Sequence, residues 1–141
     1  MTSPSSTTPR TELVKYALED LRGDAVYRGY KPKQAVLAQV AEKMPSAHVV
    51  VVSGDWCGDC RREVPKLTRI LEELPATWSV SVEGEDRDTR VKYGVRAIPT
   101  FLVFDKQDGQ EIGRIIENPS SSDGIEGDLL LLAEHAATLP K

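Results

Sequence analysis

Two cysteines, Cys57 and Cys60, are the residues of this sequence best suited to covalent chemistry, and its 141 residues contain no others. Gly58 and Asp59 separate them in a C-x-x-C pattern. A cysteine attacks as the thiolate, and two thiols at this spacing can exchange with a disulfide in two steps. A disulfide closing so short a loop would stabilise the fold by only about 2 kcal/mol in the chain-entropy model. The spacing therefore favours redox or metal chemistry over a structural cross-link.

The elements around the pair predict that both cysteines open a helix. The four valines at 49–52 predict a central strand that is buried on both faces, and apolar residues at helical spacing over 64–74 predict a helix that ends at Pro75. Free backbone N–H groups and the positive end of the helix dipole stabilise a thiolate at the first position, Cys57. Cys60 lies one turn later on the same side. We expect Cys57 to form a mixed disulfide with the substrate and Cys60 to resolve it.

A zinc site is the main alternative from the residues alone, because half of a tetrahedral site has the same C-x-x-C spacing. His48 and His135 are the only histidines that could complete it. We expect His48 at the start of a strand and His135 on the surface of the last helix, so a metal within one chain is disfavoured. Zinc bridging two chains through two such pairs is the least favoured interpretation.

The rest of the sequence predicts an α/β fold. Residues 24–30 are a loop or a short edge strand. The other expected elements are helices over 11–21 and 32–44, a strand over 78–82, a short helix closed by Gly94, a hairpin of strands 100–104 and 111–116, and a last helix from Ser122 or Asp123. This order predicts a three-layer sandwich: a mixed central sheet of about four strands, helices on both faces, and two extra N-terminal helices.

Composition limits the partners and the location. With 28% charged residues and a net charge of −4, the chain lacks the basic surface that nucleic acid requires. The sequence has no recognisable signal peptide and no run long enough to span a bilayer, so we expect a cytoplasmic protein without a membrane partner. Residues 1–9 are rich in Ser, Thr and Pro and are expected to form a disordered tail before one domain over 10–141.

Three segments resemble the thioredoxin family. Residues 56–60, W-C-G-D-C, are similar to the family's W-C-G-P-C active site, and Pro65 falls where thioredoxins place the proline of the active-site helix. Residues 92–100, K-Y-G-V-R-A-I-P-T, are similar to the family's K-Y-G-I-R-G-I-P-T. The resemblance runs from about Val49 to the C-terminus and implies a thioredoxin-like fold in which Pro99 follows a cis peptide bond and lies against the cysteines.

The resemblance also implies roles and partners. Cys57 would be the nucleophile, Cys60 the resolving thiol, and Trp56 part of the docking surface. Ile98 and Pro99 would bind an extended substrate by backbone strand addition. The redox-active disulfide would be the sole cofactor, the substrate a protein or small-molecule disulfide, and the electron donor a protein such as a flavoprotein thioredoxin reductase.

This chain departs from the family at the groups that assist the resolving thiol. Val51 stands where thioredoxins carry a buried Asp that helps to deprotonate it, and the accompanying Lys is replaced near Ser79. Water or Glu63 would have to take over that role. Asp59 replaces the motif's proline, and its carboxylate opposes a thiolate at Cys57 by like-charge repulsion.

Glu117 lies near the position of a binding-face glycine of the family. Together with Asp55 and Asp59, it predicts a surface around the thiols that disfavours acidic partners. The lost buried charge pair also leaves open a second function, in which the chain is a non-catalytic peptide-binding or redox-sensing module.

Overall fold

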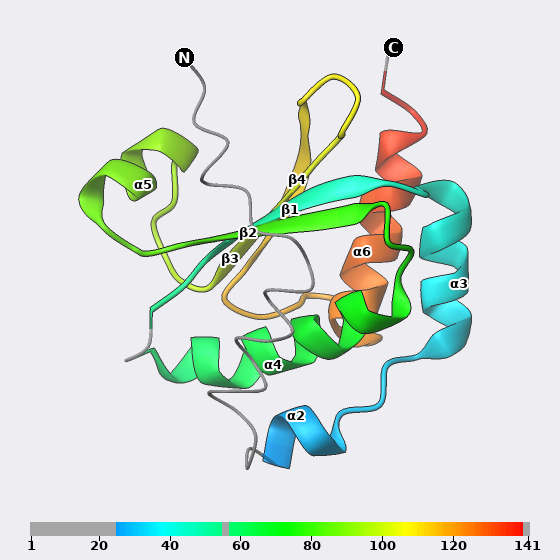
Figure 1. Ribbon diagram of the computed structural model, residues 1–141, viewed down its shortest axis with the longest axis horizontal. Helices are drawn as coiled ribbons and strands as arrows, with labels where there is room; N and C mark the ends of the chain where they lie inside the picture. Colours follow the sequence, from blue (N-terminus) through cyan, green and yellow to red (C-terminus); the bar gives the residue numbers. More distant parts are fainter. Residues whose placement is uncertain (1–24, 55–56, 140–141) are drawn as a thin grey trace.

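The computed structural model describes residues 25–54 and 57–139 (Figure 1). The predicted tail at 1–9, the predicted helix at 11–21, and Trp56 lie outside the described residues. The helices are α2 (Ala25–Gly29), α3 (Gln34–Lys43), α4 (Gly58–Glu73), α5 (Arg87–Tyr93) and α6 (Gly124–Ala136), and the strands are β1 (Ala47–Val52), β2 (Trp78–Glu83), β3 (Thr100–Phe104) and β4 (Glu111–Ile116). No helix of the described part is long and apolar enough to cross a bilayer.

The four strands form one mixed sheet in the order β2-β1-β3-β4. β1 and β2 run parallel, with α4 as the connection between them, and β3 lies antiparallel to both β1 and β4. The β3–β4 hairpin turns at Gly109, whose φ of 72° is a conformation that glycine adopts at little steric cost. The predicted mixed sheet, parallel unit and hairpin are confirmed.

Helices cover both faces of this sheet, as Figure 1 shows for α4, α3 and α6 on one face and α5 on the other. Two contacts fix the first group to the face that carries Val51. The indole N–H of Trp78 donates to the carbonyl of Met44, just after α3, over 3.0 Å. A Cβ on Gly113 would collide with the Leu132 side chain of α6. The predicted three-layer α/β architecture is confirmed.

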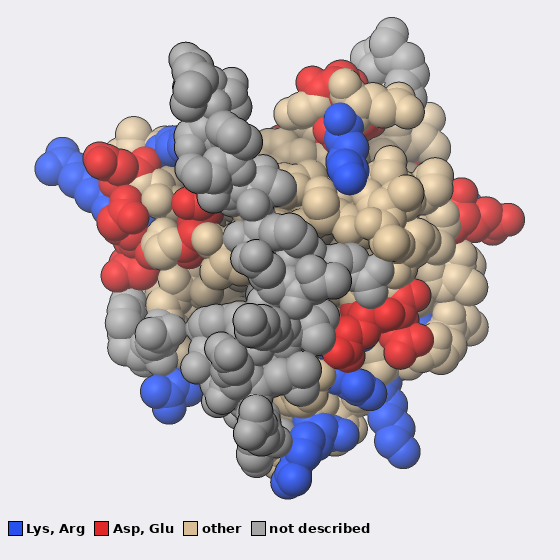
Figure 2. Space-filling view, viewed as in Figure 1, with Lys and Arg blue, Asp and Glu red and all other residues tan. Residues whose placement is uncertain are grey.

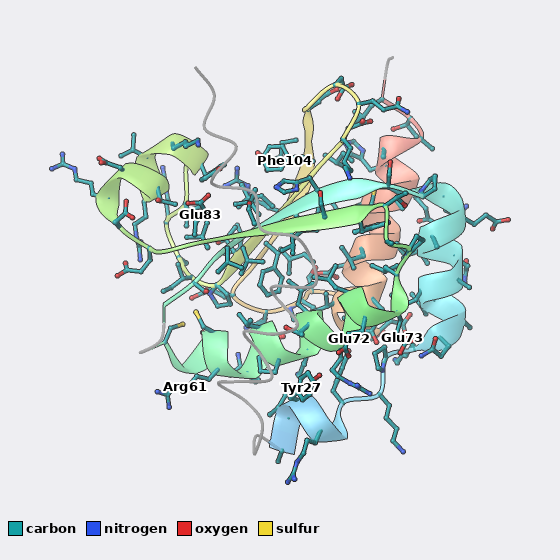
Figure 3. All side chains as sticks on the ribbon, viewed as in Figure 1. Tyr27, Arg61, Glu72, Glu73, Glu83 and Phe104 are labelled. Carbon is teal, nitrogen blue, oxygen red and sulfur yellow. The ribbon has the colours of Figure 1, made fainter. Side chains whose placement is uncertain are left out.

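The segment at 24–30 differs from both predicted alternatives, because its residues 25–29 form the helix α2. So short a helix is unstable alone and depends on tertiary contacts. The Tyr27 hydroxyl donates to Glu72 of α4 over 3.0 Å, and the Arg69 guanidinium lies 5.6 Å from the centre of the Tyr27 ring (Figure 3). These contacts come from a distant part of the chain, so local sequence could not indicate them.

The described surface carries charges of both signs. In the view of Figure 2, Lys and Arg side chains lie among Asp and Glu side chains over the visible described elements.

Candidate active site

Cys57 caps the N-terminus of α4. Its backbone is extended, with φ −85° and ψ 119°, so β1 leads into the helix through this residue. The backbone N–H of Cys60 donates to Cys57 Sγ over 3.1 Å. The sulfur occupies the place where a helix has unpaired N–H groups and a positive dipole end, and both favour a negative charge on it.

The loop before β3 meets Cys57 from the other side. Cys57 Sγ lies 3.6 Å from the backbone carbonyl oxygen of Ile98, to which its thiol donates. The Ile98–Pro99 peptide bond is cis, the isomer that the family resemblance implies. The structure thus brings together four of the residues singled out from the sequence, Cys57, Cys60, Ile98 and Pro99, although 38 positions lie between Cys60 and Pro99 along the chain.

Glu117 borders this group of residues. Its backbone N–H donates to the carbonyl of Pro99 over 2.7 Å, and its φ is 65°, in the left-handed region that favours glycine. Its side chain is exposed. The carboxylate is therefore carried on backbone anchored beside Pro99.

Both cysteines are free thiols and are buried, with 6% of Cys57 and 4% of Cys60 exposed. Burial, together with the hydrogen bond and the charge of Cys57, raises the pKa of the Cys60 thiol to about 12, although a backbone hydrogen bond at Gly54 acts in the opposite direction. Cys60 therefore keeps its proton at neutral pH until a base accepts it.

The described strand residues beside Val51 offer no such base. Val51 is fully buried and lies in register with Val82 of β2 and Phe101 of β3. On the same face, β2 presents the buried Val80. Ser79 lies on the opposite face, and its hydroxyl is 2.7 Å from Nδ1 of His48. The family's charged pair is replaced by apolar packing.

Asp59 does not face the thiols as an isolated charge. Arg62 donates to Asp59 over 2.8 Å and to Glu63 over 2.7 Å, so one guanidinium bridges the two carboxylates. The Arg62 and Asp59 side chains are both partly exposed, so solvent screening weakens the attraction between them. The predicted repulsion at Cys57 is therefore reduced by Arg62.

Glu63 is a buried carboxylate of α4, three residues after Cys60. It is 2% exposed, and one of its oxygens, Oε1, has no hydrogen-bond partner among the described residues. The other oxygen is held by Arg62 and lies 3.9 Å from the Lys66 ammonium. Positions i and i+3 of a helix are neighbours, so Glu63 follows Cys60 directly on the surface of α4. An unpaired buried oxygen of this kind has capacity to accept a proton.

Glu83 has a similar oxygen: its Oε2 is buried and has no hydrogen-bond partner among the described residues. It is in register with Val52, whose side chain points to the face opposite Val51. Figure 3 shows Glu83 on the side of β2 away from α4. The sheet therefore separates it from Cys60.

Metal binding has no counterpart among the described side chains, where no group of three or more His, Cys, Asp or Glu residues is arranged to hold an ion. The imidazole rings of both histidines lie apart from the thiols. The His48 ring nitrogens contact the hydroxyls of Ser79 and Ser81, and His135 is exposed on α6.

The sequence of this chain is similar to those of known proteins. A family model described as "Thioredoxin" matches residues 11–129. Thioredoxin-2 of Pyricularia oryzae is 36% identical over 62 residues, which is 43% of this chain and 35% of that protein. A thioredoxin of Rhodospirillum rubrum is 40% identical over 58 residues, which is 40% of this chain and 54% of that protein. The chain thus spans less than two thirds of the length of these two relatives.

A crystal structure of a Pseudomonas aeruginosa protein of unknown function is similar over most of the fold. It matches with a TM-score of 0.62 and 18% identity, over 90% of this chain and 85% of that chain. At this identity the likeness concerns the fold alone.

Proposed function

The chain belongs to the thioredoxin family, and on that premise we propose that it is a thiol–disulfide oxidoreductase that reduces protein disulfides through Cys57 and Cys60. One observation carries the proposal. Cys57 Sγ lies at the start of α4, 3.1 Å from the Cys60 nitrogen and 3.6 Å from the Ile98 carbonyl oxygen. A nucleophile, a second thiol and a stretch of backbone that can hold a peptide therefore meet at one place.

In the first step the Cys57 thiolate attacks one sulfur of the substrate disulfide. The substrate S–S bond breaks, a mixed disulfide with Cys57 forms, and the other substrate sulfur leaves as a thiolate that takes a proton from solvent. The Cys60 N–H and the dipole of α4 stabilise the attacking sulfur, whereas Cys60 itself stays protonated because of its raised pKa.

In the second step Cys60 loses its proton and attacks Cys57 Sγ. The Cys57–Cys60 disulfide forms, and the second substrate thiolate is released. We propose Glu63 as the proton acceptor, directly or through one water, because it is a buried carboxylate three residues after Cys60 on α4 and one of its oxygens has no hydrogen-bond partner among the described residues. Asp59 modulates the site through the guanidinium that it shares with Glu63.

Substrate recognition is assigned to Trp56, Ile98 and Pro99. The backbone of Ile98 would pair with an extended segment next to the substrate disulfide, as an added strand. An external donor must reduce the Cys57–Cys60 disulfide after each turnover, and a flavoprotein thioredoxin reductase is the donor proposed. The cytoplasm is the proposed location, since the mechanism needs reducing conditions.

Reduction of insulin disulfides with dithiothreitol as donor tests the proposal. The intact chain should accelerate reduction above the dithiothreitol background. Cys57→Ser should abolish this acceleration, and Cys60→Ser should leave a trapped mixed disulfide that a mass measurement detects. An intact chain that gives only the background rate would contradict the proposal.

Two observations favour the second function, a redox-sensing or peptide-binding module. Val51 leaves the resolving thiol without the family's buried carboxylate, and both cysteine residues are more than nine-tenths buried. Such a module would bind a reduced or oxidised peptide at Ile98 without turnover. In the insulin assay it would give no acceleration, while oxidation of the two thiols would still change peptide affinity.

A further inference from the structure

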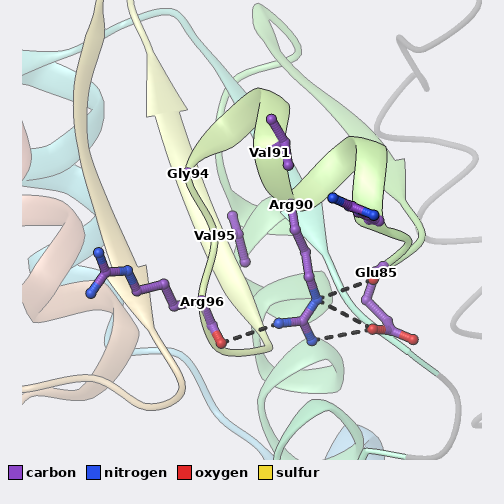
Figure 4. Close-up of a pocket in the computed structure, with 7 residues that line it drawn as sticks. Glu85, Arg90, Val91, Gly94, Val95 and Arg96 are labelled. Carbon is purple, nitrogen blue, oxygen red and sulfur yellow. Dashed lines mark hydrogen bonds and ion pairs between the residues drawn. The ribbon is translucent and has the colours of Figure 1, made fainter.

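Two arginines hold the loop that leads to Ile98. Arg90 of α5 donates through Nη1 to the carbonyl of Arg96 over 3.1 Å (Figure 4). Arg114 of β4 donates through Nη1 to the carbonyl of Gly94 over 3.3 Å. The two side chains come from elements on opposite sides of the loop along the chain, and both reach its backbone within four residues of Ile98.

Each arginine is itself held by a glutamate. Glu85 accepts from Nε and Nη2 of Arg90 over 3.3 and 3.1 Å, and its backbone carbonyl accepts from Nε over 3.1 Å. Glu111 accepts from Nε and Nη2 of Arg114 over 2.7 and 2.8 Å, one bond to each carboxylate oxygen. The Glu111–Arg114 pair is bidentate, whereas Nε and Nη2 of Arg90 share one carboxylate oxygen of Glu85 and Nε also donates to the Glu85 backbone carbonyl. In both cases two donors of the guanidinium are held, which restricts its plane and thereby the direction of its remaining donor.

The space between α5 and the loop explains why polar contacts matter here. A pocket of about 580 Å³ opens there. It is lined by Glu85, Arg87, Arg90, Val91, Gly94, Val95 and Arg96. Figure 4 shows the Arg90 guanidinium reaching past the buried Val95 to the Arg96 carbonyl, whereas the Arg96 side chain points away from it. Because the pocket leaves this side of the loop without close packing, Arg90 supplies the contact that packing would otherwise supply.

The loop is anchored on its far side as well. The Glu117 N–H donates to the Pro99 carbonyl over 2.7 Å, so the carbonyls of Gly94, Arg96 and Pro99 all have fixed partners. The Ile98 carbonyl lies between the last two and contacts Cys57 Sγ. Its position over the sulfur is therefore set by groups outside the dithiol motif.

We propose that the Glu85–Arg90 and Glu111–Arg114 pairs are positioning residues for the dithiol reaction, holding the Ile98 backbone where a substrate strand is aligned with Cys57. The inference rests on the proposed reductase function. Both ion pairs are partly exposed, with side-chain exposures between 26% and 33%, and solvent screening limits what such pairs contribute to folding. A stabilising role alone therefore does not explain two of them on one short loop. Small errors in the alignment of reacting groups cost large factors in rate.

The test compares insulin, which needs the Ile98 backbone, with a small aromatic disulfide, 5,5′-dithiobis(2-nitrobenzoate), which does not. Arg90→Gln and Arg114→Gln should each raise the KM for insulin by about tenfold, with a smaller change in kcat. The rate of the first exchange with the small disulfide and the melting temperature should stay close to those of the parent chain. Glu85→Gln should reproduce the Arg90→Gln effect, because it removes the carboxylate charge that holds the Arg90 guanidinium.

Two further variants separate positioning from charge and from stability. Arg90→Lys keeps the charge but lacks the planar fork, so it should not restore the KM. Arg69→Gln is the matched control, since Arg69 also pairs with a glutamate, Glu72 at 3.2 Å, and donates to a backbone carbonyl, on α4 away from the loop. Its kinetics should be those of the parent chain.

The inference is overturned if the arginine variants leave the KM for insulin unchanged, if Arg90→Lys restores it, or if both substrates slow down in parallel with a fall in melting temperature. Any of these results with an active parent chain leaves the proposed function standing. A parent chain that reduces neither substrate removes the proposed function and this inference together.

Discussion

Replacing Glu63 by glutamine is expected to slow the second thiol exchange and to leave the first unchanged. Glutamine has nearly the same shape and can still accept from Arg62, but its side chain does not take up a proton at neutral pH. The first exchange uses Cys57, which is stabilised by the Cys60 N–H and the helix dipole, and neither depends on Glu63.

The magnitude follows from the environment of Cys60. In the reduced chain the Cys60 pKa of about 12 means that roughly one molecule in 100,000 carries the thiolate at pH 7. The charge of Cys57 is lost in the mixed disulfide, so the pKa there is lower, but burial, the largest cause, still raises it. A positioned general base typically contributes a factor of about 10² to 10⁴. We therefore expect Glu63→Gln to slow resolution about 100-fold. In the variant the rate should rise about tenfold per pH unit above neutrality, because hydroxide and water then take the proton.

Stopped-flow release of 5-thio-2-nitrobenzoate from the small aromatic disulfide separates the two steps. The first equivalent reports attack by Cys57, and the second reports attack by Cys60 on the mixed disulfide. Glu73→Gln is the matched control, since Glu73 lies on the same helix and is exposed. A second phase with the same rate and the same pH slope in Glu63→Gln as in the parent chain would refute the assignment of Glu63.

Three further outcomes follow from the structure. Folding raises the Cys60 pKa from 9.0 to about 12, so the unfolded chain loses this proton first as the pH rises, and the contribution of Cys60 to stability is complete only below pH 9. Between pH 9 and 12 the free energy of unfolding of the reduced protein should fall by up to about 1.4 kcal/mol per pH unit. Chemical denaturation at several pH values should show a steeper fall for the parent chain than for Cys60→Ser. Glu117→Gly should remove about 1 kcal/mol of left-handed strain, offset in part by glycine's greater entropy when unfolded, so the melting temperature should stay equal or rise; a clear fall would contradict this account. Gly127→Ala should cost roughly 1–3 kcal/mol despite alanine's better helix propensity, because its Cβ would lie 2.8 Å from Asp123 Cβ and 2.9 Å from Ser121 Cβ; a gain in urea denaturation would show that the loop yields.

Local sequence was sufficient wherever one physical signal dominated. The four valines at 49–52 could form only a buried strand, and β1 contains them. The hairpin strands at 100–104 and 111–116 have the predicted bounds, because the two apolar-rich runs and the Asp-Gly turn between them are local signals. The helix opened by the cysteine pair was likewise predictable, because the apolar spacing that follows has one period.

Local sequence was insufficient where a partner lies far along the chain. The short helix α2 depends on Tyr27 reaching Glu72, 45 residues away, and its own pattern offered only a loop or an edge strand. The partner of Tyr30 is Glu126, whose carboxylate also accepts from the Lys33 backbone N–H over 2.8 Å and ties the start of α3 to α6. No periodicity marks such pairs.

The sequence by itself therefore determined the chemistry available to this protein: two thiols one helical turn apart, a following Pro99, and no carboxylate at Val51. Only the tertiary structure decided how that chemistry is arranged. It buries Cys60 and so raises its pKa, pairs Asp59 with Arg62, and sets the Ile98 carbonyl 3.6 Å from Cys57 Sγ. Within the described part of the chain it also leaves one oxygen of Glu63 without a hydrogen-bond partner. The reason is physical: thiol identity and helical spacing are properties of a short segment, whereas burial, charge pairing and loop position depend on groups that meet only when distant segments pack together.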